Sequence, residues 1–191
     1  MVEIIATIMG LIQGGLVWFD KRSNWIFYCL QYLFLGIFSF TEHLYGDVTN
    51  SVIYFGVGVA GLLFWNKDKE KNVPIRKCNK KERIIYSIII LILTIIVYCI
   101  LKETNDPLPL LDALTTTTSY IATFYMVTKK IDTWILWFIN DILYVIEYLL
   151  LPSPAVYLVL LNAIWIFMAI GSFITWNRIY KKQEEDKDVR N

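Results

Sequence analysis

Two tryptophans, an amide and a carboxylate follow one another within the stretch WILWFIND, residues 134–141. Indole rings offer flat surfaces for stacking, and Asn140 and Asp141 add hydrogen-bonding groups and a negative charge within the next turn. The stretch lies inside an apolar run, where a charged side chain costs about 2.5 to 3.5 kcal/mol and usually marks a site. The residues therefore predict a binding site for an aromatic, polar and preferably cationic small molecule. The alternative is that Asp141 or Glu147 is a proton site.

The overall composition is that of an integral membrane protein. Hydrophobic residues make up 57% of the 191 residues, compared with about 45 to 50% in soluble domains. The charges gather in short clusters and leave apolar blocks of the length that spans a bilayer as a helix. We expect seven transmembrane helices, at residues 3–19, 25–41, 45–65, 84–101, 110–128, 133–150 and 155–177. No cleavage signal flanks the first block, so a cleaved signal peptide is not expected.

The basic residues mark alternate ends of these blocks. All of the 18 Lys and Arg residues except Lys102 follow the first, third, fifth or seventh block. The positive-inside rule then places the N-terminus outside and the C-terminus in the cytoplasm, in the inner or plasma membrane of the cell. We interpret the basic stretch 67–83 as a solvated, topology-determining loop rather than a nucleic-acid or lipid patch. The tail 178–191 mixes both charges and is expected to be disordered.

The first three and the last three blocks carry similar residues at similar places. Trp25 enters the second block as Trp134 enters the sixth, and Trp65 closes the third as Trp176 closes the seventh. We therefore expect two parallel three-helix repeats, related by an axis along the membrane normal and joined by the fourth helix. The fourth helix is apolar nearly all round and should face lipid. The predicted segments are a first repeat at 1–66, a basic cytoplasmic loop at 67–83, the linker helix with an external loop at 84–109, a second repeat at 110–177 and a cytoplasmic tail at 178–191.

Polar and aromatic side chains follow single faces of these helices. At about 100° per residue, the sixth helix carries one such stripe within an arc of about 140°. Its members are Trp134, Trp137, Asn140, Asp141, Tyr144, Glu147 and Tyr148. The third helix carries a second stripe that includes Ser51, Tyr54, Gly58 and Gly61, where small residues admit a close neighbour. Many Ser and Thr residues have a simpler interpretation, which is hydrogen bonding between helices.

Four segments together resemble the PnuC family of vitamin transporters, which take up nicotinamide riboside and related precursors. They are KRSNW at 21–25, LYGD at 44–47, the run 112–122 and WILW at 134–137, which is similar to the family's W-x-x-W signature. The resemblance extends from about residue 20 to residue 177. It implies seven helices in a three-one-three arrangement, similar to full-length sugar transporters of the SWEET type. It also implies facilitated diffusion, with a separate cytoplasmic kinase that traps the substrate by phosphorylation.

The resemblance also nominates a substrate site, position by position. With Tyr144 added from the sixth-helix stripe, the predicted residues are Gln31, Ser51, Tyr54, Ser119, Trp134, Trp137, Asn140, Asp141 and Tyr144. The chain departs from the family where Ser51 and Gly58 replace the usual Gln and Asn and where Asp141 stands beside the expected amide. A carboxylate favours a cation, and thiamine, like nicotinamide riboside, is a cationic aromatic nutrient. Thiamine is therefore the alternative substrate.

Other functional classes fit the sequence less well. The single histidine, His43, stands beside Glu42 in a short external loop, and no Ser/His/Asp set, metal-ligand spacing or phosphate loop is present. We therefore predict no catalytic residue, no metal, no cofactor and no nucleic-acid partner. A seven-helix structural or signalling protein is the alternative from another class, and it would not need the two stripes to converge. The sequence leaves open a homo-oligomer and the movement of an ion with the substrate.

Overall fold

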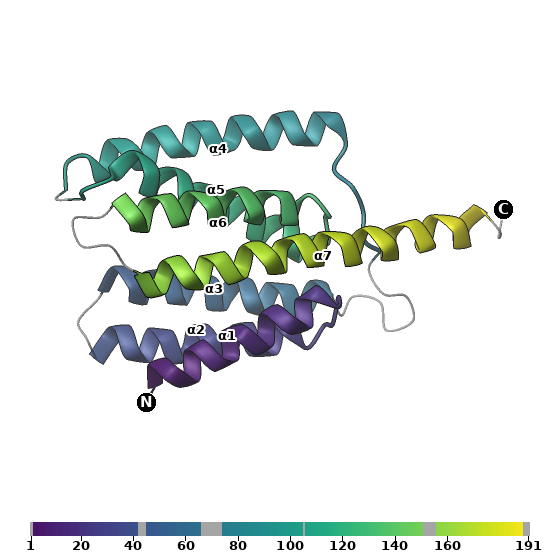
Figure 1. Ribbon diagram of the computed structural model, residues 1–191, viewed down its shortest axis with the longest axis horizontal. Helices are drawn as coiled ribbons and strands as arrows, with labels where there is room; N and C mark the ends of the chain where they lie inside the picture. The colour runs from purple at the N-terminus through teal and green to yellow at the C-terminus, as the bar shows by residue number, and fades with distance from the viewer. Residues whose placement is uncertain (1, 42–44, 66–73, 105, 151–155, 189–191) are drawn as a thin grey trace. The chain divides into compact units, whose positions relative to one another are not determined.

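The computed structural model describes residues 2–41, 45–65, 74–104, 106–150 and 156–188, and these residues form seven α-helices (Figure 1). The helices are α1 (Val2–Trp18), α2 (Asn24–Thr41), α3 (Tyr45–Phe64), α4 (Lys80–Leu101), α5 (Pro109–Val127), α6 (Thr133–Leu150) and α7 (Val156–Asp188). Apart from the end of α7, every helix begins and ends within four residues of the limits of a predicted block. The prediction of an all-α fold with seven helices is confirmed.

The described helices differ in how clearly they could cross a membrane. By length and composition, α4, α6 and the segment Val159–Asp186 of α7 are long and apolar enough. Shorter apolar stretches occupy Ile4–Trp18, Asn24–Ile37 and Asn50–Phe64. Helix α5 is in neither group, because its run of threonines lowers its mean hydropathy.

Helix α7 continues well past its predicted end. The expectation of a disordered tail is wrong for residues 178–188, which are helical as far as Asp188. Lys, Glu and Gln are good helix formers, and opposite charges four residues apart, such as Lys181 and Glu185, support a solvated helix. In Figure 1 this part of α7 extends beyond the other helices of its unit.

The chain forms two compact units, Met1–Pro74 and Ile75–Asn191. In the first unit α2 packs against both α1 and α3, and in the second α6 packs against both α5 and α7, with α4 added on the far side of α5. Residues 75–83, predicted as part of a loop, thus belong to the second unit together with α4. The middle helix of each triplet is the one that follows a short turn rich in charged residues.

The turns that enter the two middle helices have the same backbone conformation. Asp20 and Lys129 adopt the left-handed region, with φ of 53° and 52°. The N–H groups of Lys21 and Lys130 each donate to a carbonyl five residues earlier, both at 2.9 Å. These positions differ by 109 residues in both cases. A residue with positive φ after the last turn lets a helix end abruptly, so the chain reverses its direction within a few residues at both places.

Matching tryptophan pairs then join the middle and third helix of each triplet. Trp25 of α2 meets Trp65, which directly follows α3, edge to face with ring centroids 5.5 Å apart and planes at 84°. Trp134 of α6 meets Trp176 of α7 in the same way, at 5.3 Å and 86°. Edge-to-face packing of large buried rings stabilises such a contact beyond the area that it buries.

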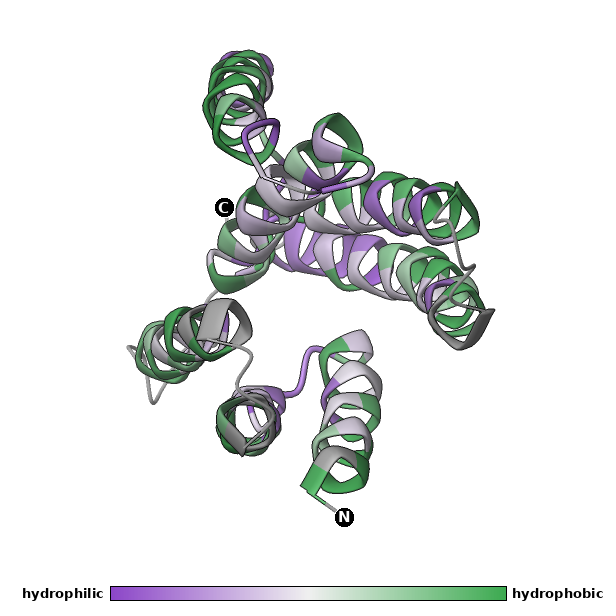
Figure 2. Ribbon diagram, turned by 90° about the vertical axis from the view of Figure 1, so that its left-hand side faces the viewer, coloured by the Kyte–Doolittle hydropathy of each residue, from purple (hydrophilic) through white to green (hydrophobic). Residues whose placement is uncertain are grey.

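Helix α4 has few buried side chains. Its apolar residues are exposed along most of the helix, and Figure 2 shows apolar colouring over most of its length. Thr94 is its buried residue, and the Thr94 hydroxyl lies 2.7 Å from that of Thr117 on α5. This pattern agrees with the expectation that the helix faces lipid.

Candidate substrate-binding site

The start of α6, which carries the W-x-x-W segment, is fixed by hydrogen bonds that join the side chains of Asp132 and Thr133 to three other segments. The Thr133 hydroxyl donates to the carbonyl of Ala122 on α5 at 2.8 Å. The Asp132 carboxylate accepts from the backbone N–H of Cys78 at 2.8 Å and from Nε of Arg83 at 2.7 Å. Together these bonds hold the first turn of α6, and therefore the residues that follow it, against α5 and the beginning of α4.

Lys130 is at the centre of this attachment. Its side chain is only 1% exposed. Its ammonium group lies 3.1 Å from a carboxylate oxygen of Glu82 and 4.6 to 5.4 Å from the ring centroids of Tyr125, Tyr86 and Phe124. A carboxylate and several aromatic faces compensate a buried ammonium group for the loss of water. Lys130 thus has a structural role in addition to marking one end of the helices.

The segment before α4 completes the attachment. Residues 75–83 of the predicted solvated loop are exposed at most positions but are held to the second unit, and residues 67–73 lie outside the described residues. Ile75 and Cys78 are buried, and Arg76 pairs through its backbone with the α5–α6 turn, donating to Lys129 at 3.0 Å and accepting from Ile131 at 2.9 Å. Asn79 and Glu82 form a reciprocal capping box at the start of α4. The Asn-x-x-Glu spacing was a signal in the sequence that could have identified this helix start.

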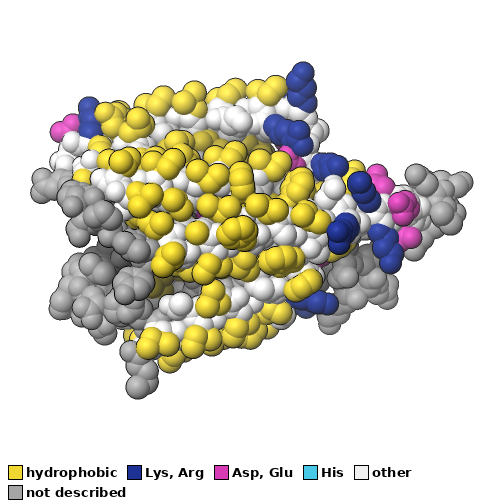
Figure 3. All heavy atoms as spheres, in the orientation of Figure 1, with side chains coloured by type: hydrophobic (Ala, Val, Ile, Leu, Met, Phe, Trp, Pro, Cys, Tyr) yellow, Lys and Arg dark blue, Asp and Glu magenta, His cyan; other side chains and the backbone are white. Residues whose placement is uncertain are grey.

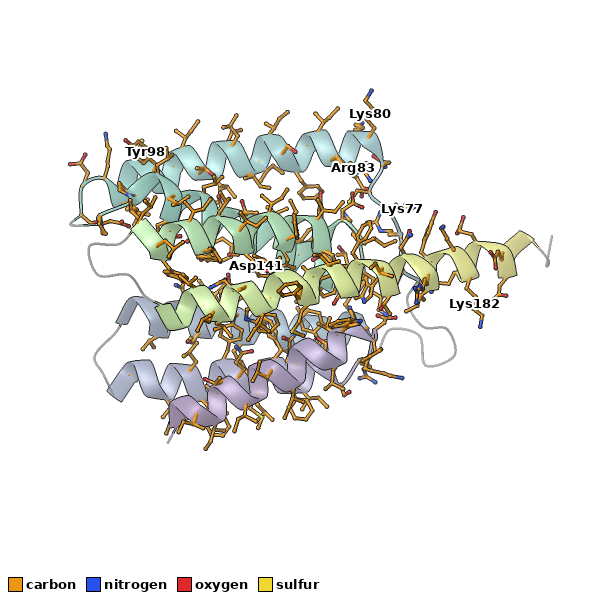
Figure 4. All side chains as sticks on the ribbon, viewed as in Figure 1. Lys77, Lys80, Arg83, Tyr98, Asp141 and Lys182 are labelled. Carbon is orange, nitrogen blue, oxygen red and sulfur yellow. The ribbon has the colours of Figure 1, made fainter. Side chains whose placement is uncertain are left out.

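This packing shifts the pKa values of two groups that precede the apolar block 84–101. The backbone N–H of Asn79, followed by Lys130 and Arg76, holds the pKa of the Glu82 carboxyl below its usual value. Burial raises the pKa of the Cys78 thiol. Lysine and arginine side chains gather at this end of the second unit, where Figure 4 labels Lys77, Lys80, Arg83 and Lys182 and Figure 3 shows dark-blue side chains.

The stripe on α6 begins with two tryptophans in different surroundings. Trp134 is buried and packs edge to face on Trp176, and its indole N–H has no acceptor among the described residues. Trp137, one turn further, is only half-buried. Trp134 therefore has a packing role between α6 and α7, and Trp137 is the better placed of the two to stack on a ligand.

Asn140 and Asp141 follow at mid-length of α6, as Figure 4 shows for Asp141. Asn140 is 0% exposed and Asp141 is 5% exposed. Neither amide atom of Asn140 has a hydrogen-bond partner among the described residues. A buried amide normally has its hydrogen bonds satisfied, so this one has a donor and an acceptor available for a ligand.

The C-terminal half of the stripe is formed by two tyrosines and a second carboxylate. The rings of Tyr144 and Tyr148 stack with centroids 5.6 Å apart and planes at 9°. Glu147 accepts a hydrogen bond from the hydroxyl of Thr115 on α5 at 3.2 Å. The predicted site residue Ser119 is also on α5, where it is buried and donates to the carbonyl of Thr116 at 2.7 Å.

The other three predicted site residues belong to the first unit. Gln31 lies against Gly10 of α1, since its amide nitrogen would be 2.8 Å from a Cβ added there. Ser51 is buried against Gly36 of α2. Tyr54 stacks on Tyr32 with centroids 4.8 Å apart. The structure therefore groups these three around α2 and the other six on α5 and α6, and each group is described within its own unit.

An apolar groove of about 250 Å³ runs between α6 and α7. Its lining residues are Trp134, Ile135, Phe138, Ala169, Ile170 and Phe173. Trp134 is the only residue of the α6 stripe among these lining residues. The groove therefore does not provide the polar groups expected of a site for a polar ligand. His43, considered above as a catalytic candidate, lies outside the described residues.

Comparisons with known proteins agree on one family. The family model described as nicotinamide mononucleotide transporter matches residues 1–178. The chain is 20% identical to the nicotinamide riboside transporter PnuC of Neisseria mucosa, over 93% of this chain and 72% of that protein. It is 22% identical to the protein of the same name from Escherichia coli, over 78% of this chain and 74% of that protein.

A solved structure has the same fold. The crystal structure of the vitamin B3 transporter PnuC superposes with a TM-score of 0.75 at 19% identity, over 95% of this chain and 82% of that one. The family resemblance predicted from the sequence is confirmed, and the apolar helices are those of a multi-pass membrane protein. The chain belongs to the nicotinamide mononucleotide transporter family.

Proposed function

We propose that this protein transports nicotinamide riboside across the membrane by facilitated diffusion. Membership of a transporter family makes it a transporter rather than an enzyme, and the relatives described above are named as transporters of this substrate. The observation that carries the proposal is the set of residues at mid-length of α6. There the half-buried ring of Trp137 is followed one turn later by the buried Asn140 and Asp141.

The chemistry of these residues matches the substrate. In this proposal the nicotinamide ring stacks on Trp137 and Trp134, and the Asn140 amide pairs with the carboxamide of the ring. Asp141 balances the positive charge of the pyridinium. In the first unit the proposal assigns substrate contacts to Gln31, Ser51 and Tyr54, and in the second unit to Ser119 on α5 and Tyr144 on α6. The unpaired amide of Asn140 gains its hydrogen bonds when the substrate is bound.

We further propose how the fold performs transport. The helices form a 3+1+3 arrangement in which two parallel triplets rock about the site by alternating access. The matching turns at Asp20 and Lys129 and the matching tryptophan pairs support the relation between the triplets. The N-terminus is outside and the C-terminus cytoplasmic, and a separate cytoplasmic kinase traps the substrate by phosphorylation.

Thiamine is a second candidate substrate, because Asp141 favours a cation and thiamine is also an aromatic cation. The residues Ser51 and Gly58 on α3 are smaller than the side chains expected for nicotinamide riboside and add a reason to test it. Both candidates predict the same stacking on Trp137. They differ in which compound competes for uptake.

The test is uptake of labelled nicotinamide riboside into proteoliposomes without an ion gradient. Saturable uptake that equilibrates, and that excess unlabelled nicotinamide riboside but not thiamine blocks, is the expected result. Trp137→Ala should abolish it. Phe138→Ala is the matched control, because Phe138 is also an aromatic residue of α6 but lines the apolar groove. No uptake above that of empty liposomes, or competition by thiamine alone, would show that the proposed substrate is wrong.

A further inference from the structure

Two carboxylates lie on the same helix, six residues apart. Asp141 and Glu147 are 5% and 8% exposed, and the rise of a helix separates them by about 9 Å along α6. Buried charges inside an apolar helix are costly and are found where they pair with another charge or take part in function. The hydrogen-bond and ion-pair partners of these two side chains therefore show whether they have a structural or a functional role.

No cation of the described residues pairs with either carboxylate. The ion pairs that Arg76, Arg83, Lys102 and Lys130 form lead to other carboxylates, and none of these four side chains reaches Asp141 or Glu147. Glu147 is held instead by a neutral donor, the hydroxyl of Thr115 at 3.2 Å. Among the described residues, neither of these two carboxyl groups in the apolar helix therefore has a positively charged partner.

Aromatic rings lie between the two carboxylates around the helix. At about 100° per residue, Asp141 is about 120° around the helix from Glu147. Measured from Glu147 toward Asp141, Tyr144, Trp137 and Tyr148 are at about 60°, 80° and 100°. Tyr144 and Tyr148 stack on each other at 5.6 Å. Aromatic faces attract cations, most strongly where water is excluded. The arc therefore has the composition of a surface for a positively charged ring.

Asn140 gives an independent indication that this surface binds a ligand. It is 0% exposed, it is one turn from both Trp137 and Tyr144, and neither of its amide atoms has a partner among the described residues. Hydrogen bonding to a ligand would remove the cost of burying these atoms.

We propose that Asp141 and Glu147 are the charge-selecting residues of the transporter, so that it accepts a cationic ring and rejects an uncharged ring of the same shape. The substrate ring moves along the aromatic arc from Tyr148 and Tyr144, near the C-terminal end of α6, to Trp137. Asp141 lies on one side of this arc and Glu147 on the other. This inference rests on the proposed transport of nicotinamide riboside and adds the reason for its selectivity. Under this inference the transporter requires a substrate ring with a fixed positive charge, which is a narrower class than aromatic nutrients in general.

The experiment compares nicotinamide riboside with its 1,4-dihydro form, which has nearly the same shape but no charge. Binding of each form to the purified protein in lipid nanodiscs is measured by calorimetry, and uptake is measured in proteoliposomes with protein-free liposomes as the leak control. We expect the wild-type protein to bind the cation about 100-fold more tightly than the dihydro form. Asp141→Asn and Glu147→Gln should each reduce this ratio about tenfold, which corresponds to about 1.4 kcal/mol.

Matched variants separate charge selection from a general loss of structure. Glu103→Gln removes an acidic side chain that is 76% exposed beyond the end of α4, and it should leave the ratio unchanged. Asp141→Asn and Glu147→Gln should retain the wild-type affinity for the dihydro form, which shows that they are folded. If either binds neither form, Asp141→Glu or Glu147→Asp replaces it and should keep the preference for the cation.

The outcomes distinguish this inference from the proposed function. Wild-type protein that binds and transports both forms equally, or a ratio unchanged in both neutral variants, overturns charge selection and leaves nicotinamide riboside transport standing. Wild-type protein that binds and transports neither form overturns the proposed function, and charge selection for this ring with it.

Discussion

Replacing Gly61 by alanine should loosen the first triplet, because the ring of Trp25 already occupies the space of the added methyl group. Two ring atoms, Cε2 and Cε3, would be 2.5 Å from a Cβ at this position. The ring cannot easily withdraw, since Trp25 is fully buried and contacts Trp65 on one side and Tyr28 on another. Overpacking of this kind costs about 1 to 3 kcal/mol. A local opening would then be about 5- to 150-fold more populated.

Gly56→Ala is the matched control on the same helix. No atom lies within 4 Å of a Cβ added at Gly56, so this change adds helix propensity without a clash. Alanine is favoured over glycine in a helix by about 0.5 to 1 kcal/mol. The two substitutions are chemically identical and lie five residues apart on α3, so their difference isolates the contact with Trp25.

The buried cysteines provide the assay. Cys29 is in the first unit and Cys78 in the second, and both are buried, whereas Cys99 is exposed and is first replaced by serine. Reaction of each thiol with a fluorescent maleimide in detergent then reports the opening of its own unit. Gly61→Ala should accelerate labelling of Cys29 without a similar effect on Cys78. If Cys29 reacts no faster in Gly61→Ala than in Gly56→Ala, the packing argument for the Trp25 contact is wrong.

Three further predictions concern the second unit. Thr117→Val should lower stability by about 1 to 3 kcal/mol, because the buried Thr94 hydroxyl loses its described partner. Thr94→Val should cost less, because the Thr117 hydroxyl still donates to the carbonyl of Ala113 at 2.8 Å. The double variant should cost less than the sum, and thermal unfolding of all four proteins in detergent measures the coupling. Asp132→Ala should lower stability by a similar amount and speed the labelling of Cys78, whose N–H loses its acceptor. The Glu82 carboxylate stabilises the fold at pH values above its ordinary pKa of about 4.3. Because its pKa is lowered in the folded protein, this stabilisation is lost as the pH falls through the lowered value. Glu82→Gln should remove that part of the pH dependence of stability, as thermal unfolding between pH 6 and 3 would show.

The helices could be predicted from the sequence because their lengths follow from the apolar blocks. The sequence also indicated that Trp25 and Trp134, and Trp65 and Trp176, stand at corresponding places, and the structure gives the two pairs the same ring geometry. The end of α7 was missed because low hydrophobicity was taken as disorder, although lysine and glutamate favour a solvated helix as strongly as most apolar residues do.

The attachment at the start of α6 could not be predicted from composition. A lysine beside a membrane helix is ordinarily solvated. Burial of Lys130 depends on Glu82 and Tyr86 of α4, which are distant in sequence, as well as on Phe124 and Tyr125 at the end of α5. The left-handed turns could not be predicted either, because Asp20 and Lys129 occupy positions where glycine is the usual sequence signal for this conformation. These features arise from tertiary contacts, which local sequence patterns do not encode.

The difference between the two triplets indicates where the charge chemistry resides. Tyr28 and Gln31 of α2 are 109 residues before Trp137 and Asn140 of α6, so both middle helices have an aromatic ring followed by an amide. The next position, however, is Tyr32 in one triplet and Asp141 in the other. Tyr32 stacks on Tyr54 at 4.8 Å, whereas Asp141 has no ion pair among the described residues. The first triplet thus uses this position for packing and the second keeps a carboxylate there, so a substrate that required only stacking and an amide would give no reason for the difference.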